Sequence, residues 1–224
     1  MIIKHSFREF KKCYRILLRK SYPVIFCLFG VLIQPTDLFA ERAWQLFQKD
    51  HELTVYSLKT EEPVDCEFKA VGIIHQPIEV VRAALMDIPT YMKWIHGCRN
   101  VKLLKKKNDS NCEVYFAIDI PWPFYNRDII YRITNDATAG EERMVIQGIA
   151  IEKADVPIRE GYDRVIEAHF HLTLEKITDV STKVIYQSKT NPSFNAPAYL
   201  SRIICGSMVY NSMVNLKTLL NNGY

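Results

Sequence analysis

The chain has 224 residues, of which 48% are hydrophobic, and this is enough apolar material for one well-packed domain. The formal net charge is +4, but residues 1–40 carry seven Lys and Arg against two acidic residues, so residues 41–224 have 22 basic and 23 acidic side chains and a net charge of −1. A near-neutral body gives no electrostatic support for nucleic-acid binding, and that class of function is excluded.

Residues 1–40 have the layout of a secretory signal peptide. A basic region is followed by the apolar run "PVIFCLFGVLI", residues 23–33, by the helix-breaking "QPTD" and by Ala40. The apolar run is shorter than the roughly 20 residues that cross a bilayer. We therefore expect cleavage after Ala40 and export of residues 41–224 to the periplasm or the medium. The alternatives are a membrane anchor through residues 23–33 and a buried helix.

The first half of the exported part combines helices with strands. In chain order, the pattern predicts a short helix, two strands joined by the turn "EEPVD", and two helical pieces, at residues 41–51, 53–60, 66–75, 76–87 and 88–95. Pro77 stands in the first turn of the longer helical piece, where a missing N–H costs nothing.

Three hairpins and a long helix are predicted in the second half. The strands fall at residues 100–107, 112–120, 127–134, 143–151, 162–177 and 182–190, and the helix at residues 196–220. Phe116, Ile118 and Ile120 share one strand face, and Ile166, Phe170 and Leu172 share another, so one sheet face is apolar and the other wet. These elements predict an α+β domain, in which a curved antiparallel sheet wraps on the C-terminal helix and leaves an apolar cavity.

Cysteine and histidine spacing indicates no metal site. Four cysteines remain after cleavage: Cys66, Cys98, Cys112 and Cys205. In an oxidising compartment they allow three disulfide connectivities, and separate buried thiols are equally compatible with the sequence. His169 and His171 project to one side of a strand, but that side is the polar, solvent-exposed face of the sheet. We expect neither a metal nor a cofactor.

Three segments, in this order, resemble START domains, the StAR-related lipid-transfer family, and in particular a bacterial secreted type. They are "VVRAALMDIPTYMKWIHGCRNVKLL", "PWPFYNRDIIYR" and "NPSFNAPAYLSRII", at residues 80–104, 121–132 and 191–204. In the last segment Phe194 stands where the family has glycine. The resemblance implies the helix-grip fold (START/Bet v 1-like) and a lipid ligand inside it.

The resemblance also places the loop at residues 121–126 at the mouth of the cavity, beside the terminal helix. Pro121 and Pro123 cannot donate ladder hydrogen bonds and so end strand pairing, which leaves Trp122, Phe124 and Tyr125 free to fold over the opening. The alternative is a rigid turn whose aromatic side chains cap the core. Residues 191–197 are the expected hinge of the helix.

Arg127 and Asp128 open the strand after this loop and point to opposite sides. Arg127 lies two and four residues before Ile129 and Tyr131 and so on the same side of the strand, which places it at the inner edge of the cavity. A buried guanidinium needs an acceptor, so we expect either a lipid headgroup or a structural bridge to a carboxylate or to loop carbonyls. Asp128 is expected to accept backbone amides of the loop.

The predicted ligand-binding residues combine the inner strand positions, the loop and the terminal helix. They are Phe116, Ile118, Ile120, Trp122, Phe124, Arg127, Ile129, Tyr131, Ile133, Ile146, Phe170, Leu172, Tyr186, Tyr199, Ile203 and Ser207. Sterol carriers of the family place an acid and a base where this chain has Val114 and Ile133, so recognition of a sterol hydroxyl by such a pair is not expected.

The resemblance and the apolar inner face favour non-enzymatic binding and transfer of a lipid or other hydrophobic molecule, with transient contact to a membrane surface. The lysines at residues 105–107 are candidates for contact with anionic headgroups. An enzyme of the aromatic polyketide cyclase type would need inward-facing acids, bases or hydroxyls, and the inward positions are nearly all apolar, with Tyr131, Ser188 and Arg127 as exceptions. A ligand-sensing module is the third alternative, which the sequence does not separate from a carrier.

Overall fold

The computed structural model describes residues 44–58, 65–136, 142–153, 155–194 and 196–223. The predicted signal peptide, residues 1–40, lies outside these ranges and stays a prediction. Residues 41–224 make up one compact unit. Within the described ranges, no helix is long and apolar enough to cross a bilayer.

One ten-stranded sheet is the frame of this unit. Its strands are β1 (Trp44–Asp50), β2 (Leu53–Leu58), β3 (Cys66–Ile74), β4 (Cys98–Asn108), β5 (Asn111–Ile118), β6 (Asn126–Asp136), β7 (Arg143–Ala150), β8 (Tyr162–Val165), β9 (Ala168–Thr178) and β10 (Ser181–Thr190). They lie in the order β1-β2-β3-β10-β9-β7-β6-β5-β4, with β8 paired to β6 beside that path. The β6–β8 pair is parallel, and the other pairs are antiparallel.

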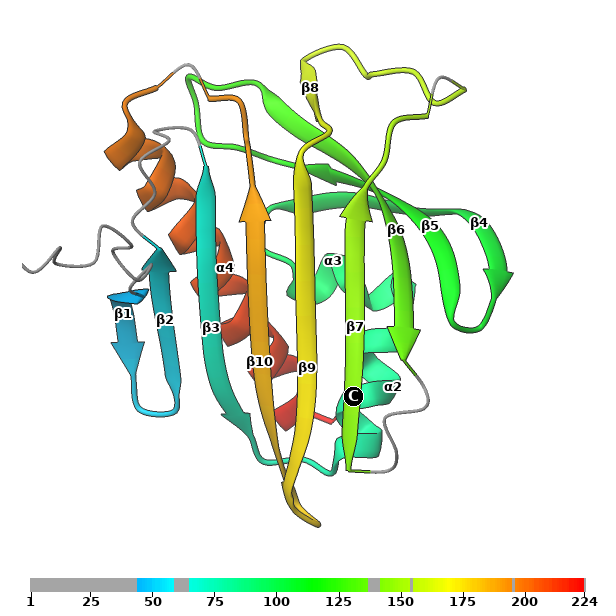
Figure 1. Cartoon of the computed structure of the whole chain (residues 1–224), viewed down its shortest axis with the longest axis vertical. Coiled ribbons are helices and arrows are strands. Elements are labelled where there is room, and N and C mark those ends of the chain that lie inside the picture. Colours follow the sequence, from blue (N-terminus) through cyan, green and yellow to red (C-terminus); the bar gives the residue numbers. More distant parts are fainter. Residues whose placement is uncertain (1–43, 59–64, 137–141, 154, 195, 224) are drawn as a thin grey trace, which may run out of the picture. The chain divides into compact units, whose positions relative to one another are not determined.

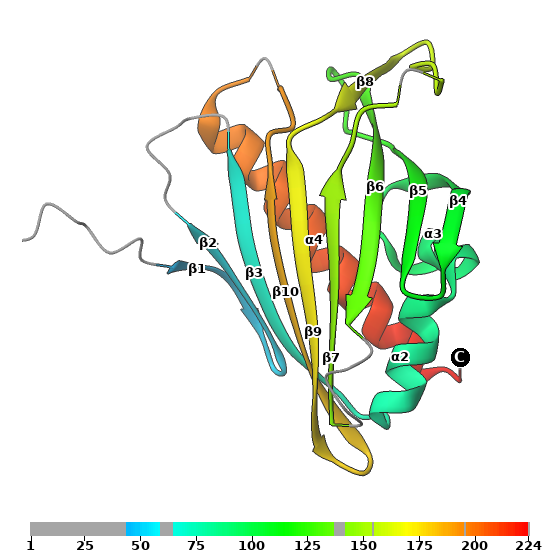
Figure 2. The same ribbon diagram turned by 45° about the vertical axis from the view of Figure 1, so that its right-hand side comes forward.

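The helices of the described ranges all lie on one face of the sheet (Figures 1 and 2). After β3 come α2 (Ile78–Met86), the short 3₁₀ helix η1 (Ile88–Thr90) and α3 (Tyr91–Trp94), and α4 (Ala198–Asn221) ends the chain. The long α4 runs across the inner side of the curved sheet, with buried side chains at Met213 and Leu216 in the common core. The predicted helix-grip arrangement is confirmed.

The helix predicted at residues 41–51 is wrong, because β1 forms there and pairs with β2. Phe47 packs edge-on against Phe68, with ring centroids 5.4 Å apart. Its ring also lies over Gly206 of α4, where an added Cβ would come within 2.3 Å of the ring. These distant contacts and the strand pairing outweigh the helical spacing of so short a segment, and the close approach requires glycine at position 206.

The single strand predicted at residues 162–177 is two elements. β8 pairs with β6, whereas β9 lies between β7 and β10. Ile166, predicted to face inward with Phe170, falls between the two strands and is 48% exposed. The chain changes its pairing partner at this point, so alternation does not continue through it.

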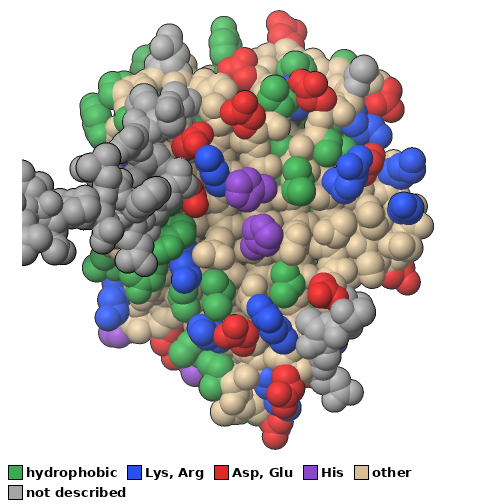
Figure 3. Space-filling view, viewed as in Figure 1, with side chains coloured by type: hydrophobic (Ala, Val, Ile, Leu, Met, Phe, Trp, Pro, Cys, Tyr) green, Lys and Arg blue, Asp and Glu red, His purple; other side chains and the backbone are tan. Residues whose placement is uncertain are grey.

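The outer face of the sheet is exposed to solvent only in part. His169 and His171 are exposed, as predicted, and Figure 3 shows histidines on this face among acidic and basic side chains. Over β5 and β6 the prediction of a solvent-exposed face is wrong. There the segment between β7 and β9 covers the sheet, and it buries Tyr115, Ala117 and Ile130 against Ile151, Val156 and Tyr162. No metal-binding group of three or more His, Cys, Asp or Glu side chains occurs in the described part of the chain.

Candidate ligand-binding cavity

An apolar cavity of about 220 Å³ lies between the inner face of the sheet and α4. Seven strands, β3 and β5 to β10, supply one side of its wall, and α2, α3 and α4 supply the other. Residues two apart on a strand face the same side, which explains why alternation predicts many of them. The structure places eleven of the predicted residues in the wall: Phe116, Ile118, Ile120, Arg127, Ile129, Tyr131, Ile133, Ile146, Phe170, Leu172 and Tyr186.

Residues outside that prediction complete the wall. α4 contributes one helical face, made of Cys205, Met208, Val209, Ser212 and Met213. The remaining additions are Cys66, Phe68, Leu85, Tyr91, Trp94, Ile95, His96, Val165, Ser188, Thr190, Pro192 and Phe194. Four of these could have been found from the alternation of inward and outward residues along β3 and β10: Cys66, Phe68, Ser188 and Thr190.

The predicted contacts from α4 are on the wrong side of the helix. Tyr199 is 67% exposed and Ile203 is 51% exposed, and neither these residues nor the half-buried Ser207 lie in the wall. Because α4 is apolar around most of its circumference, spacing alone does not select the inner face. Its rotation depends on contacts such as that of Phe47 with Gly206.

The loop between β5 and β6 does not cover the cavity as predicted. Trp122 is 91% exposed, so it points into solvent. Phe124 is half-buried and lies outside the wall, and its ring centroid is 5.2 Å from that of Phe194, which does line the cavity. Of the segment between β5 and β6, Ile120 lines the cavity, whereas the aromatic side chains reach it only through the contact of Phe124 with Phe194.

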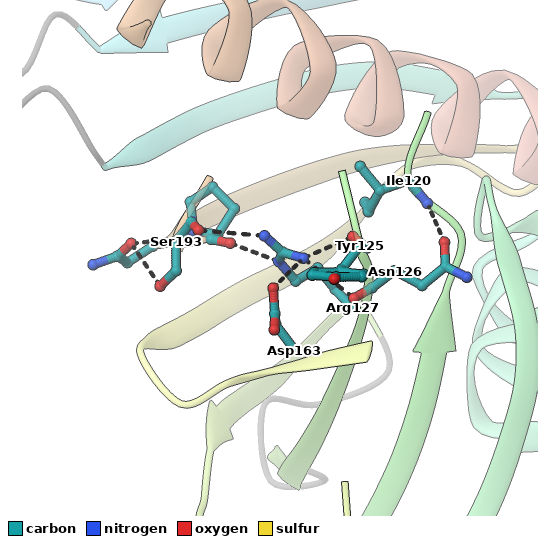
Figure 4. A network of polar contacts seen from close by, with 8 residues as sticks. Ile120, Tyr125, Asn126, Arg127, Asp163 and Ser193 are labelled. Atoms are coloured by element: carbon teal, nitrogen blue, oxygen red, sulfur yellow. Dashed lines mark hydrogen bonds and ion pairs between the residues drawn. The ribbon is translucent and has the colours of Figure 1, made fainter. Parts of the chain in front are cut away.

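Arg127 is a structural bridge among three segments (Figure 4). Its buried guanidinium donates to four backbone carbonyls and one carboxylate, those of Pro192 (2.7 Å), Tyr125 (2.7 Å), Asn126 (3.2 Å), Ser193 (3.3 Å) and Asp163 (2.9 Å). It also lies 4.9 Å from the centre of the Phe194 ring. Burial lowers the pKa of Arg127, and the charge of Asp163 opposes that shift. The β5–β6 loop, β8 and the segment before α4 are thus tied together.

Asp128 is paired with an arginine, and not with loop amides as predicted. Its fully buried carboxylate accepts hydrogen bonds from Nε and Nη2 of Arg164, at 2.6 and 2.9 Å. This pairing raises the pKa of Arg164. Arg164 also donates to the carbonyl of Val156, in the segment that covers the outer face. β6 therefore starts with two ionic bridges, one on each side of the sheet.

A row of aromatic rings crosses the cavity wall. Neighbouring ring centroids are 5.1 to 6.1 Å apart in the order Trp94, Tyr91, Phe116, Tyr131, Phe170 and Tyr186. The Phe170 ring lies over Gly148, where an added Cβ would be 2.1 Å from it. Since rings on both sides restrict Phe170, the absence of a side chain at position 148 sets the depth of the cavity here.

Replacing Gly148 with alanine is expected to weaken both folding and ligand binding. The methyl group would push the Phe170 ring into the cavity, and overpacking of this kind costs about 1–3 kcal/mol in the free energy of unfolding. Chemical denaturation and titration with a fluorescent fatty-chain probe measure the two effects. Gly72→Ala is the control, since its Cβ would be 3.5 Å from the nearest atom. Equal losses at both positions would contradict the role given to Phe170.

Cys66 and Cys205 are neighbours across the cavity wall, from β3 and α4. The four described cysteines are free thiols. Cys66 Sγ donates to the carbonyl of Ser201 at 3.5 Å, one helical turn before Cys205. A thiol–thiol hydrogen bond to Cys66, together with burial, raises the pKa of Cys205. Burial likewise raises the pKa of Cys98 to about 11.

Comparisons with known sequences give distant relatives. The sequence matches no protein-family model. It is 26% identical over 175 residues to an uncharacterized protein of Pseudomonas aeruginosa, which covers 78% of this chain and 85% of that one. It is also 26% identical over 160 residues to the phosphatidylcholine transfer protein of Rattus norvegicus, which covers 70% of this chain and 74% of that one.

Comparisons with solved structures agree on the fold. The STAR-related lipid transfer protein from Xanthomonas axonopodis superposes with a TM-score of 0.70 at 23% identity, over 80% of this chain and 98% of that one. The Zhui aromatase/cyclase from a Streptomyces species superposes with a TM-score of 0.53 at 14% identity, over 70% and 93%. The chain therefore has the fold of a START domain.

Proposed function

We propose that the protein binds a hydrophobic molecule in the cavity between the sheet and α4 and carries it between membranes without chemical change. The apolar cavity is the observation that carries this proposal. Burial of a methylene group is worth about 0.8 kcal/mol, so a dozen methylenes offset on the order of 10 kcal/mol of exposure to water. Similarity to a phosphatidylcholine transfer protein supports a lipid as the ligand.

The cavity favours a small ligand. Its volume of about 220 Å³ is below the roughly 300–1,000 Å³ that is usual for ligand pockets. A lipid with a single chain therefore suits the observed cavity better than a phospholipid with two chains.

Catalysis is not part of this proposal. A general acid or base must be within hydrogen-bond reach of the reacting atoms. Among the described residues of the wall there is no Asp or Glu, Arg127 is engaged by carbonyls and Asp163, and His96 is exposed. The described part of the wall thus offers a cyclase hydroxyl groups and thiols, but no carboxylate.

Export and membrane contact complete the proposal. The basic and apolar pattern of residues 1–40 supports export. Trp122 and Tyr125 support contact, since they are 91% and 67% exposed on the β5–β6 loop and such side chains favour the interface between membrane and water.

Native mass spectrometry of protein purified from its own host, with identification of the released lipid, tests the proposal. Fluorescent-lipid exchange between vesicles then tests transfer. The proposal is wrong if the protein carries no hydrophobic molecule and leaves the exchange of lipid between vesicles at its spontaneous rate.

Replacing Trp122 with alanine is expected to slow exchange between vesicles severalfold while the free energy of unfolding stays within about 0.5 kcal/mol, because the side chain is exposed. Exchange kinetics and denaturation measure the two quantities. Val180→Ser is the control, since Val180 is 66% exposed in the turn after β9, at the other end of the sheet (Figure 1). If both variants slow exchange equally, the β5–β6 loop is not the docking site.

A further inference from the structure

The cavity wall offers no free charge to a ligand. Of its described residues, Arg127 and His96 are the only basic ones, and none is acidic. Arg127 already donates to four carbonyls and contacts Asp163. His96 lies at an exposed position between α3 and β4, so it does not reach deep into the cavity. A carboxylate or phosphate inside would therefore remain unpaired, which is costly in an apolar site.

Hydroxyl groups are gathered at one end of the cavity, near the segment that leads to α4. They belong to Tyr131 of β6 and to Tyr186, Ser188 and Thr190 of β10. All four residues line the cavity. Strand register places Thr190, Ser188 and Tyr186 at successive inward positions of β10, beside Ala168, Phe170 and Leu172 of β9. Farther from Thr190 the wall is apolar, with Leu85 and Met213.

Each of these hydroxyls can form hydrogen bonds with a ligand, since a hydroxyl has one donor and two acceptor positions. Burial raises the pKa of both Tyr131 and Tyr186. The phenols therefore stay neutral at physiological pH and add no charge of their own.

We propose that the ligand is a lipid with an uncharged hydroxyl or ester head, that Tyr131 and Tyr186 bind this head, and that carboxylate and phosphate heads are rejected. This inference rests on the proposed carrier function and specifies its ligand class. The tail of the lipid occupies the apolar end.

A chain-matched series tests the selectivity: lauryl alcohol, monolaurin, laurate and lauryl phosphocholine, each titrated calorimetrically into the full chain below its micelle concentration. We expect the alcohol and monolaurin to bind at least about tenfold more tightly than the two charged lipids. Tyr131→Phe and Tyr186→Phe should each weaken binding of the neutral lipids about fivefold to tenfold, the effect of one lost hydrogen bond. Tyr56→Phe, outside the wall, should change nothing.

The outcomes separate the two levels of the proposal. If no member of the series binds, the carrier function fails. If laurate or lauryl phosphocholine binds as tightly as the neutral lipids, the carrier function stands and the charge selectivity is wrong. If selectivity is present but both phenylalanine variants, with unchanged melting temperatures, bind like the parent, the two tyrosines do not hold the head.

Discussion

Replacing Arg127 with methionine is expected to lower the free energy of unfolding by about 3 kcal/mol or more and to speed the release of bound lipid. The substitution removes the donor for four buried or half-buried carbonyls, and each unsatisfied group costs about 1–3 kcal/mol unless water reaches it. Two of these carbonyls, of Pro192 and Ser193, belong to the segment that joins β10 to α4. Without the bridge, this segment and the start of α4 are free to move away from the β5–β6 loop.

Arg164→Met is the matched control for this prediction. It leaves the fully buried Asp128 without its partner, so a loss of about 3–5 kcal/mol is expected. Its other acceptors, Val156 and Pro157, lie in the segment over the outer face, away from α4. Denaturation gives both stabilities, and stopped-flow displacement of a fluorescent lipid gives both release rates. Equal acceleration by the two variants would mean that general loss of stability, and not the Arg127 bridge, controls release.

Joining Cys66 to Cys205 is expected to slow lipid exchange about tenfold or more, which corresponds to a barrier higher by about 1.4 kcal/mol. The two thiols belong to β3 and to the second turn of α4, and both line the cavity. A covalent link between them prevents the start of α4 from moving away from the sheet. If lipid enters and leaves between these elements, exchange must become slower.

The crosslink is made in a Cys98→Ser, Cys112→Ser background, with diamide as the oxidant, which takes up the two hydrogen atoms that the thiols lose. Alkaline pH is needed because the pKa of Cys205 is raised and the thiolate is the reactive form. Dibromobimane bridges the two sulfurs if their geometry does not allow a disulfide. Cys205→Ser with the same treatment is the control. Complete crosslinking, shown by mass spectrometry, with unchanged exchange would place the route of the lipid elsewhere.

The sequence by itself determined the strands that carry the cavity. Phe116 and Ile118 on β5, and Ile129, Tyr131 and Ile133 on β6, line it as alternation predicts. A strand has a period of two, so once one side is known to be buried, every second residue is assigned. The same argument applies to Phe170 and Leu172 on β9. The breaks at Pro121 and Pro123 are equally local, since proline lacks the N–H that pairing needs.

Only the tertiary structure decided features that depend on distant partners. β1 forms a strand where the local spacing favours a helix, because Phe47 meets Phe68 and Gly206. α4 turns Cys205 inward and Tyr199 outward, a choice that its apolar circumference leaves open. Arg127 is bound by carbonyls of Pro192 and Ser193, whose positions follow from the path of the chain between β10 and α4. The repeat of apolar residues along an element, and the side of a strand on which a residue falls, depend on neighbours along the chain. The contacts named here join residues far apart in sequence, so they exist only once the sheet has closed around the helix.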